Sequence, residues 1–305
     1  MVLELHRTPS VMQSDQSTQK QASTVLRKLK ELPRKVQRDP QPKRVHQLRT
    51  TIRRTETLIK TIGMQNGNQR KLLKKLERLR RRTGKVRALD VQIAAQRTVK
   101  GGGIGRQKAE LMGLLEKKRE KQERKLLGTL GNKNLSDIRN RSEYLASAVK
   151  SEMQAAGNIR IGLATLLRKF TKAAGIASSL TEKSLHELRL QCKSVRYSAE
   201  LAGNSVPSGE MIAKLKRIQD SIGEWHDWRT LARSAHKWLG EVTGTLLPAM
   251  LDGITREKFR EAVQTTIQTA DELSRIAGEQ RSGENRKKPA AKAQSAPMRR
   301  AARAS

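Results

Sequence analysis

The sequence predicts an all-α protein, and three observations support that prediction. Leucine, isoleucine and valine recur at spacings of three and four residues along most of the chain, which is the period of an amphipathic helix. Alternating strand patterns are scarce. Aromatic residues make up only 2% of the 305 residues, so the composition fits a core of aliphatic helices rather than an aromatic-rich β core.

The first part of the chain divides into helices at its proline and glycine positions. Residues 1–17 are expected to be disordered. Asp39-Pro40-Gln41-Pro42 ends the first helix, Gly84 turns the chain after the third and precedes another short helix, and Gly101–Gly105 is a flexible linker. In order, the main expected helices cover about 18–38, 43–62, 67–82, 106–127, 135–155 and 159–173.

The second part repeats the pattern of the first. Expected helices cover about 181–203 and 211–222, another opens at Trp225 after Gly223, and the last spans 255–278. Residues 281–305 are rich in lysine, arginine, alanine and proline, which predicts a disordered basic tail. The folded region is therefore expected over 18–280, with one half at about 18–157 and the other at about 158–280.

Two of these helices carry the same row of histidine and cations. The first row holds His46, Arg49, Arg53 and Arg54, and the second holds His186, Arg189, Lys193 and Arg196. In each helix the histidine is followed by cations three and seven residues later, which places them on one face. That face runs beside the apolar stripe, so the cations should line a crevice between helices.

The charge balance points to a polyanionic partner. The formal net charge is +35, and in residues 43–87 the only acidic side chains are Glu56 and Glu77. Such an excess is costly for a folded chain and suggests nucleic acid, an anionic membrane surface or a phosphate polymer. Seven Trp, Tyr and Phe residues in total are few for a protein that stacks bases.

Other classes of function have little support in the sequence. Cys192 is the only cysteine, so neither an intramolecular disulfide nor a thiolate metal cluster can form. There is no His-Glu-x-x-His motif and no run of 18 apolar residues. We expect no metal, cofactor, catalytic residue or membrane span, and a cytoplasmic protein.

The doubled row resembles the CHAD family, the conserved histidine α-helical domain. The resemblance covers about residues 20–280 and rests on Val45-His46-Gln47-Leu48-Arg49, on Leu185-His186-Glu187-Leu188-Arg189, and on a glycine at a matched distance after each row, Gly84 and Gly223. It implies two pseudo-symmetric helical bundles around a basic central channel that binds inorganic polyphosphate, and a location at polyphosphate granules would fit. The β-strand signature of the fused triphosphate tunnel domain is missing, so the resemblance implies a stand-alone, non-catalytic binding module.

The resemblance also implies which residues face the channel. They are His46, Arg49, Arg53, Arg54, Lys75 and Arg78 from one half, and His186, Arg189, Lys193, Arg196, Lys214 and Arg217 from the other. Three positions depart from the shared pattern. Glu56 stands where the second copy has Arg196, Ser194 stands where the first has Arg54, and Ala88 replaces the aspartate kept as Asp227.

Several alternatives stay open at this point. The histidines can instead be core-edge residues bonded to a carbonyl, and Arg78 and Arg217 can belong to a solvated face. A nucleic-acid-associated protein that uses the channel face or the basic tail is the alternative function, and hydrolysis or synthesis of polyphosphate is a third. The oligomeric state does not follow from the sequence. Because the charge excess is concentrated in residues 43–87, that segment should contribute more affinity than residues 181–240.

Overall fold

The computed structural model describes residues 9–62, 67–151, 170, 180–202, 209–239 and 246–286, and these contain helices without any strand. The all-α prediction is therefore confirmed. The helices are α1 (Pro9–Arg38), α2 (Pro42–Ile62), α3 (Gly67–Thr98), α4 (Gly105–Thr129), α5 (Asn132–Ser151), α7 (Glu182–Ala202), α8 (Gly209–Leu239) and α9 (Leu246–Arg286).

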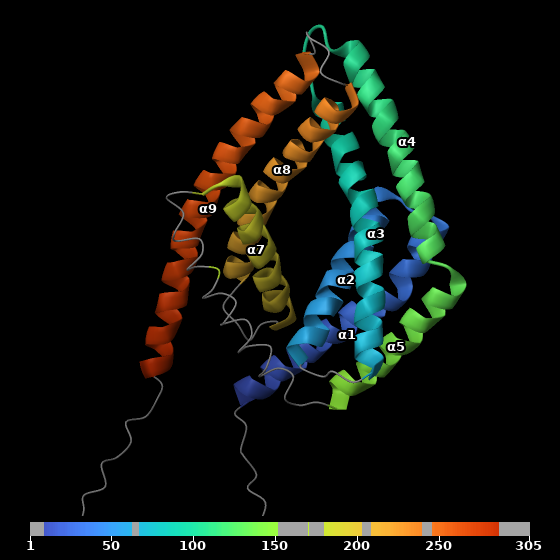
Figure 1. Cartoon of the computed structure of the whole chain (residues 1–305). Coiled ribbons are helices and arrows are strands. Elements are labelled where there is room, and N and C mark those ends of the chain that lie inside the picture. Colours follow the sequence, from blue (N-terminus) through green and yellow to red (C-terminus); the bar gives the residue numbers. More distant parts are fainter. Residues whose placement is uncertain are drawn as a thin grey trace, which may run out of the picture.

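The helices pack in two groups that meet along α2 and α7. In the first group α2 packs on α1 and α3, α5 packs on α1 and α3, and α4 runs along α3. In the second group α8 packs on α7 and α9. Figure 1 shows α3 with α4, and α8 with α9, as two long hairpins whose tips meet at the top of the view. Contacts between α2 and α7, and between α3 and α8, join the groups.

The apolar core repeats between the two groups position by position. Counted from the histidine of each row, the buried side chains of α2 (Val45, Leu48, Ile52, Thr55 and Ile59) match those of α7 (Leu185, Leu188, Cys192, Val195 and Ala199). The same holds, counted from the later glycine, for Leu72, Leu76, Leu79, Thr83 and Val86 of α3 against Met211, Leu215, Ile218, Ile222 and Trp225 of α8. One continuous core includes most of these residues. The repeat thus extends from sequence to burial, while the pseudo-twofold axis stays a prediction.

A second, smaller core joins the tips of the two hairpins. It includes Leu89 and Ile93 of α3, Leu231 of α8 and Leu251 of α9. The backbone N–H of Leu247 donates to the side chain of Gln107 at 3.0 Å across this contact. The glycine-rich linker also lies against α9, because a Cβ at Gly101 would be 2.7 Å from the side chain of Met250 and a Cβ at Gly103 would be 3.2 Å from that of Leu246.

Helix boundaries differ from the sequence prediction at both glycine marks. Helix α3 continues through Gly84 and α8 continues through Gly223, so neither glycine ends a helix. The reason is that the buried stripe keeps its three-and-four spacing on both sides of each glycine, and this packing outweighs the weak helix propensity of glycine.

Two terminal boundaries also differ. Helix α1 begins at Pro9, so residues 9–17 are helical rather than disordered, and proline suits a first helical turn because no partner is needed there for an N–H. Helix α9 runs from Leu246 to Arg286, longer at both ends than the expected 255–278. The expected boundary near 157, most of the expected helix 159–173 and the tail beyond 286 lie outside the described residues.

Candidate functional site

The two cationic rows face each other where α2 packs against α7. Arg49 and Arg53 of α2 and Arg189 and Lys193 of α7 are half-buried and close enough to perturb one another's ionisation. We call these four residues the cation cluster. In the described part of the chain none of the four forms an ion pair with a carboxylate within 4.0 Å. Four cations without a close counter-ion make a ready site for an anion.

Lys193 is the most perturbed of the four. Burial, and then the charges of Arg189 and Arg53, lower its pKa from 10.5 to about 7. Asp227 acts in the opposite direction but does not offset the cations. Lys193 is therefore only partly protonated at neutral pH until an anion arrives.

Arg49 is held in place by the backbone of α3. Its Nη1 donates to the carbonyl of Arg80 at 2.8 Å. Burial and the charge of Arg53 lower its pKa to about 10, so it remains charged at neutral pH. A Cβ at Gly84 would lie 2.6 Å from this Nη1, whereas a Cβ at Gly223 would meet no atom within 4 Å. Gly84 thus provides the space that the Arg49 guanidinium occupies.

Glu200 joins the two rows at one flank of the cluster. Its Oε2 accepts a hydrogen bond from Nε of Arg54 at 2.7 Å, and its Oε1 accepts one from Nη1 of Arg196 at 3.0 Å. Arg196 also donates from Nε to Gln219 at 2.8 Å. Arg54 and Arg196 are therefore brought together from the two helices, but they already share a carboxylate.

The two row histidines are influenced by residues at equivalent positions of α3 and α8. Burial, and then the charge of Arg87, lower the pKa of His46. The ring of His186 stacks on His226 at 5.7 Å, and burial followed by His226 lowers its pKa. Arg87 and His226 both lie three residues after the repeated glycine. Both row histidines are thus neutral near pH 7 and can each donate one hydrogen bond.

Glu56, the departure in the first row, is accounted for by a contact that both copies make. Its carboxylate accepts a hydrogen bond from Nε of Arg80 at 3.0 Å. At the equivalent positions of the second copy, Arg196 donates to Gln219. Each pair links the row helix to the residue four positions before the repeated glycine. Glu56 therefore replaces the donor of this pair by an acceptor and is neutralised by Arg80.

Four predicted site residues lie on α3 and α8, and none of them is seen to pair within the cluster. Lys75 pairs with Asp137 of α5 at 2.9 Å, and Lys214 pairs with Glu272 of α9. The two lysines occupy equivalent positions, nine residues before the repeated glycine. Arg78 and Arg217 are exposed. In the structure Lys75 therefore connects α3 to α5, and Lys214 connects α8 to α9.

Sequence reasoning missed three residues that shape the site. Glu200 was missed because its role depends on the crossing of α2 and α7. Arg80 was missed because its backbone carbonyl, not its side chain, holds Arg49. Arg87 lies as far after Gly84 as His226 lies after Gly223, so this signal was available in the sequence.

Two other kinds of site find no support in the described ranges. No group of three or more His, Cys, Asp or Glu residues there is placed to hold a metal ion. None of the helices described is long and apolar enough to cross a membrane.

Comparison with known protein families finds a match over most of the chain. The family model described as CHAD domain matches residues 20–236. The crystal structure of the CHAD domain from the plant Ricinus communis is similar, with a TM-score of 0.57 and 17% identity over 89% of this chain and 91% of that one. PptA from Streptomyces chartreusis gives a TM-score of 0.60 and 17% identity, over 87% of this chain and all of its own. No curated protein matches the sequence. At such identities the two structures support the fold alone.

Proposed function

Since the chain belongs to the CHAD domain family, we propose that its cation cluster binds inorganic polyphosphate, the ligand that the family resemblance implies. The main support is the convergence of the two rows, which leaves Arg49, Arg53, Arg189 and Lys193 without a close carboxylate in the described structure. Phosphate oxygens would supply the missing counter-charge, with arginine able to make bidentate contacts and lysine a point contact.

The site extends beyond the cluster on both flanks. His46 and His186 offer neutral N–H donors next to the cations, and Arg54 and Arg196 exchange part of their bond to Glu200 for phosphate oxygens. Together these residues line the channel implied by the family resemblance. Within each row, successive cations lie about one helical turn, roughly 5 Å, apart. This spacing suits an anion whose phosphates repeat along a chain.

The residues around the cation cluster suit polyphosphate better than nucleic acid. Tyr197, which lies near Arg49 and Arg189, is only 5% exposed, so its ring offers no face on which a base could stack. Proteins that bind single strands gain about 1–3 kcal/mol per base from such faces. A ligand made of phosphate alone needs none.

The proposed role is binding without catalysis, and a location at polyphosphate granules is part of the proposal. Shortening of polyphosphate during incubation with the protein and magnesium would contradict the first part. Absence of the tagged protein from granules in cells that contain them would contradict the second.

Titration with tripolyphosphate and with long-chain polyphosphate tests the binding site. The variant Arg53→Ala/Lys193→Ala removes two cluster cations and leaves no described carboxylate without its partner. We expect its affinity for both ligands to fall at least about tenfold, because hydrogen bonds to charged groups contribute roughly 1.5–3 kcal/mol each. The matched control is Lys117→Ala/Lys121→Ala, two exposed lysines of α4.

Two results would count against the proposal. If the cluster variant binds as tightly as the control variant, the site lies elsewhere. If RNA displaces polyphosphate at equal phosphate concentration, the alternative of a nucleic-acid-associated protein replaces it. Affinity should also fall steeply with salt in either case, because bound cations are released from the polyanion.

A further inference from the structure

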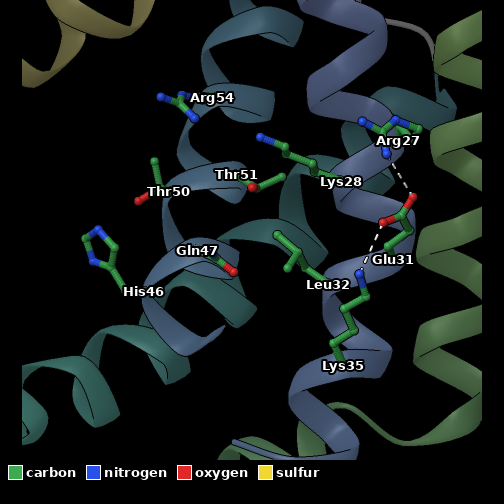
Figure 2. A pocket seen from close by; sticks show the side chains of 10 residues that line it. All are labelled: Arg27, Lys28, Glu31, Leu32, Lys35, His46, Gln47, Thr50, Thr51 and Arg54. Atoms are coloured by element: carbon green, nitrogen blue, oxygen red, sulfur yellow. Dashed lines mark hydrogen bonds and ion pairs between the residues drawn. The ribbon is translucent and has the colours of Figure 1, made fainter. Parts of the chain in front are cut away.

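A basic groove opens between α1 and α2, beside the cation cluster. Its volume is about 350 Å³, and Figure 2 shows cations of α1 on one wall and His46 and Arg54 of α2 on the other. His46 lines this groove and is close enough to Arg49 of the cluster for that charge to lower its pKa, so this histidine lies at the junction of cluster and groove. The residues that line the groove include Arg27, Lys28, Lys35, His46 and Arg54.

A second basic groove adjoins the first on another side of α1. It lies between α1 and α5 and has a volume of about 480 Å³. The two grooves share Arg27, Glu31 and Lys35, so they are neighbours across one wall of α1. Residues that line only the second groove are Lys30, Arg34, Arg38, Arg139 and Glu143.

The acidic residues of these grooves are already neutralised. Glu31 pairs with Arg27 at 3.3 Å and with Lys35 at 3.5 Å. Glu143 pairs with Lys30 at 3.7 Å and with Arg139 at 3.3 Å.

Three exposed cations remain in excess. Lys28 lines the first groove, and Arg34 and Arg38 line the second. No carboxylate of the described chain forms an ion pair with any of the three.

We propose that these two grooves form a second polyphosphate-binding surface, which takes the part of a long chain that leaves the cation cluster past His46 and Arg54. This inference rests on the proposed function of the cluster. From Arg27 to Arg38 the surface extends about 16 Å along α1, at 1.5 Å per residue. A short ligand fills the cluster alone, whereas a long chain bound there is tethered to the grooves at high effective concentration.

The proposal predicts a dependence on chain length that is confined to α1. The variant Lys28→Ala/Arg34→Ala/Arg38→Ala removes three exposed cations without leaving a described carboxylate unpaired. The matched control, Lys117→Ala/Lys121→Ala/Arg124→Ala, removes the same charge from exposed positions of α4 that line neither groove. Affinities for tripolyphosphate and long-chain polyphosphate are measured for both, over a series of salt concentrations.

Relative to the control variant, the α1 variant should bind long-chain polyphosphate about tenfold more weakly. Its affinity for tripolyphosphate should not change. Its slope of log affinity against log salt should fall by up to about three units, one per lost phosphate contact. Equal losses in the α1 and control variants overturn the proposal, because the effect is then one of net charge. An equal loss for RNA of matched length also overturns it.

Failure of the cluster is distinguishable from failure of the grooves. If Arg53→Ala/Lys193→Ala leaves tripolyphosphate binding intact, the proposed function fails whatever the α1 variant does. If that variant loses tripolyphosphate binding and the α1 variant keeps full affinity for the long chain, only the second surface is refuted.

Discussion

Gly84 and Gly223 occupy the same place in the two copies but have different surroundings. At Gly84 a Cβ would lie 2.6 Å from Nη1 of Arg49, and at Gly223 it would meet nothing within 4 Å. Both glycines lie inside long helices, where alanine is ordinarily favoured by about 0.5–1 kcal/mol. The two positions therefore form a matched pair.

We expect Gly84→Ala to weaken tripolyphosphate binding several-fold, because the Arg49 guanidinium must leave the carbonyl of Arg80. The fold should survive, since the clashing atom is the end of a flexible side chain. Gly223→Ala should instead raise the free energy of unfolding by up to about 1 kcal/mol and leave binding unchanged. Titration and urea denaturation of both variants measure this, and identical behaviour of the two would refute the role given to Gly84.

Lys193 makes binding dependent on pH above neutrality. Its pKa of about 7 in the free protein should rise when phosphate oxygens surround it. Binding near and above pH 7 therefore takes up a proton, and affinity falls as pH increases. Calorimetry in buffers of different ionisation enthalpy measures this uptake. Lys193→Met should abolish most of it, and an unchanged uptake would show that another group is responsible.

The folding stability of the free protein should rise with pH over the range in which the affinity falls. The lysine has a pKa of about 7 in the folded chain and 10.5 in the unfolded one, so between these values the unfolded chain holds more protons. The destabilisation from Lys193 is present below pH 7 and is relieved as pH rises toward 10.5. Denaturation across that window, with Lys193→Met as control, separates this effect from the loss of affinity.

At the scale of elements, spacing in the sequence predicted the helices and the two rows but not how they end or what holds them. The three-and-four spacing around Leu48 and Leu188 was enough to place each row beside a buried stripe. Local propensity predicts a helix end at Gly84, whereas the buried stripe that overrides this propensity is a tertiary contact. The bridge through Glu200 depends on a helix crossing that no local pattern encodes.

The lysines of α3 and α8 illustrate the same limit. The family resemblance implies that Lys75 and Lys214 face the channel, yet in the structure they pair with Asp137 of α5 and Glu272 of α9. We therefore expect Lys75→Ala/Lys214→Ala to lower the melting temperature slightly and to leave tripolyphosphate affinity within twofold of the unmodified protein. Exposed and partly exposed ion pairs contribute little to stability, so we expect only a small shift in melting temperature. Melting temperature and tripolyphosphate affinity are therefore both measured. A loss of affinity as large as that of Arg53→Ala/Lys193→Ala would return these lysines to the site.

At the scale of the whole molecule, charge acts on folding and on binding in opposite senses. A net charge of +35 repels itself in the compact state. The cation cluster concentrates that repulsion between α2 and α7, the helices along which the two groups of helices meet. Under the proposed function, a bound polyanion relieves this repulsion and stabilises the folded chain by an amount that grows with the logarithm of ligand concentration over dissociation constant.

Added salt should therefore raise the melting temperature of the free protein and lower its affinity for polyphosphate. Screening over a Debye length of about 8–10 Å at physiological ionic strength weakens the repulsion among the cations. Binding releases cations that were associated with the polyanion, and a higher salt concentration reduces the free energy gained from that release. Melting curves with and without polyphosphate over a salt series should thus converge as salt increases. Parallel curves, with a constant gap between free and bound protein, would show that charge neutralisation is not what drives binding.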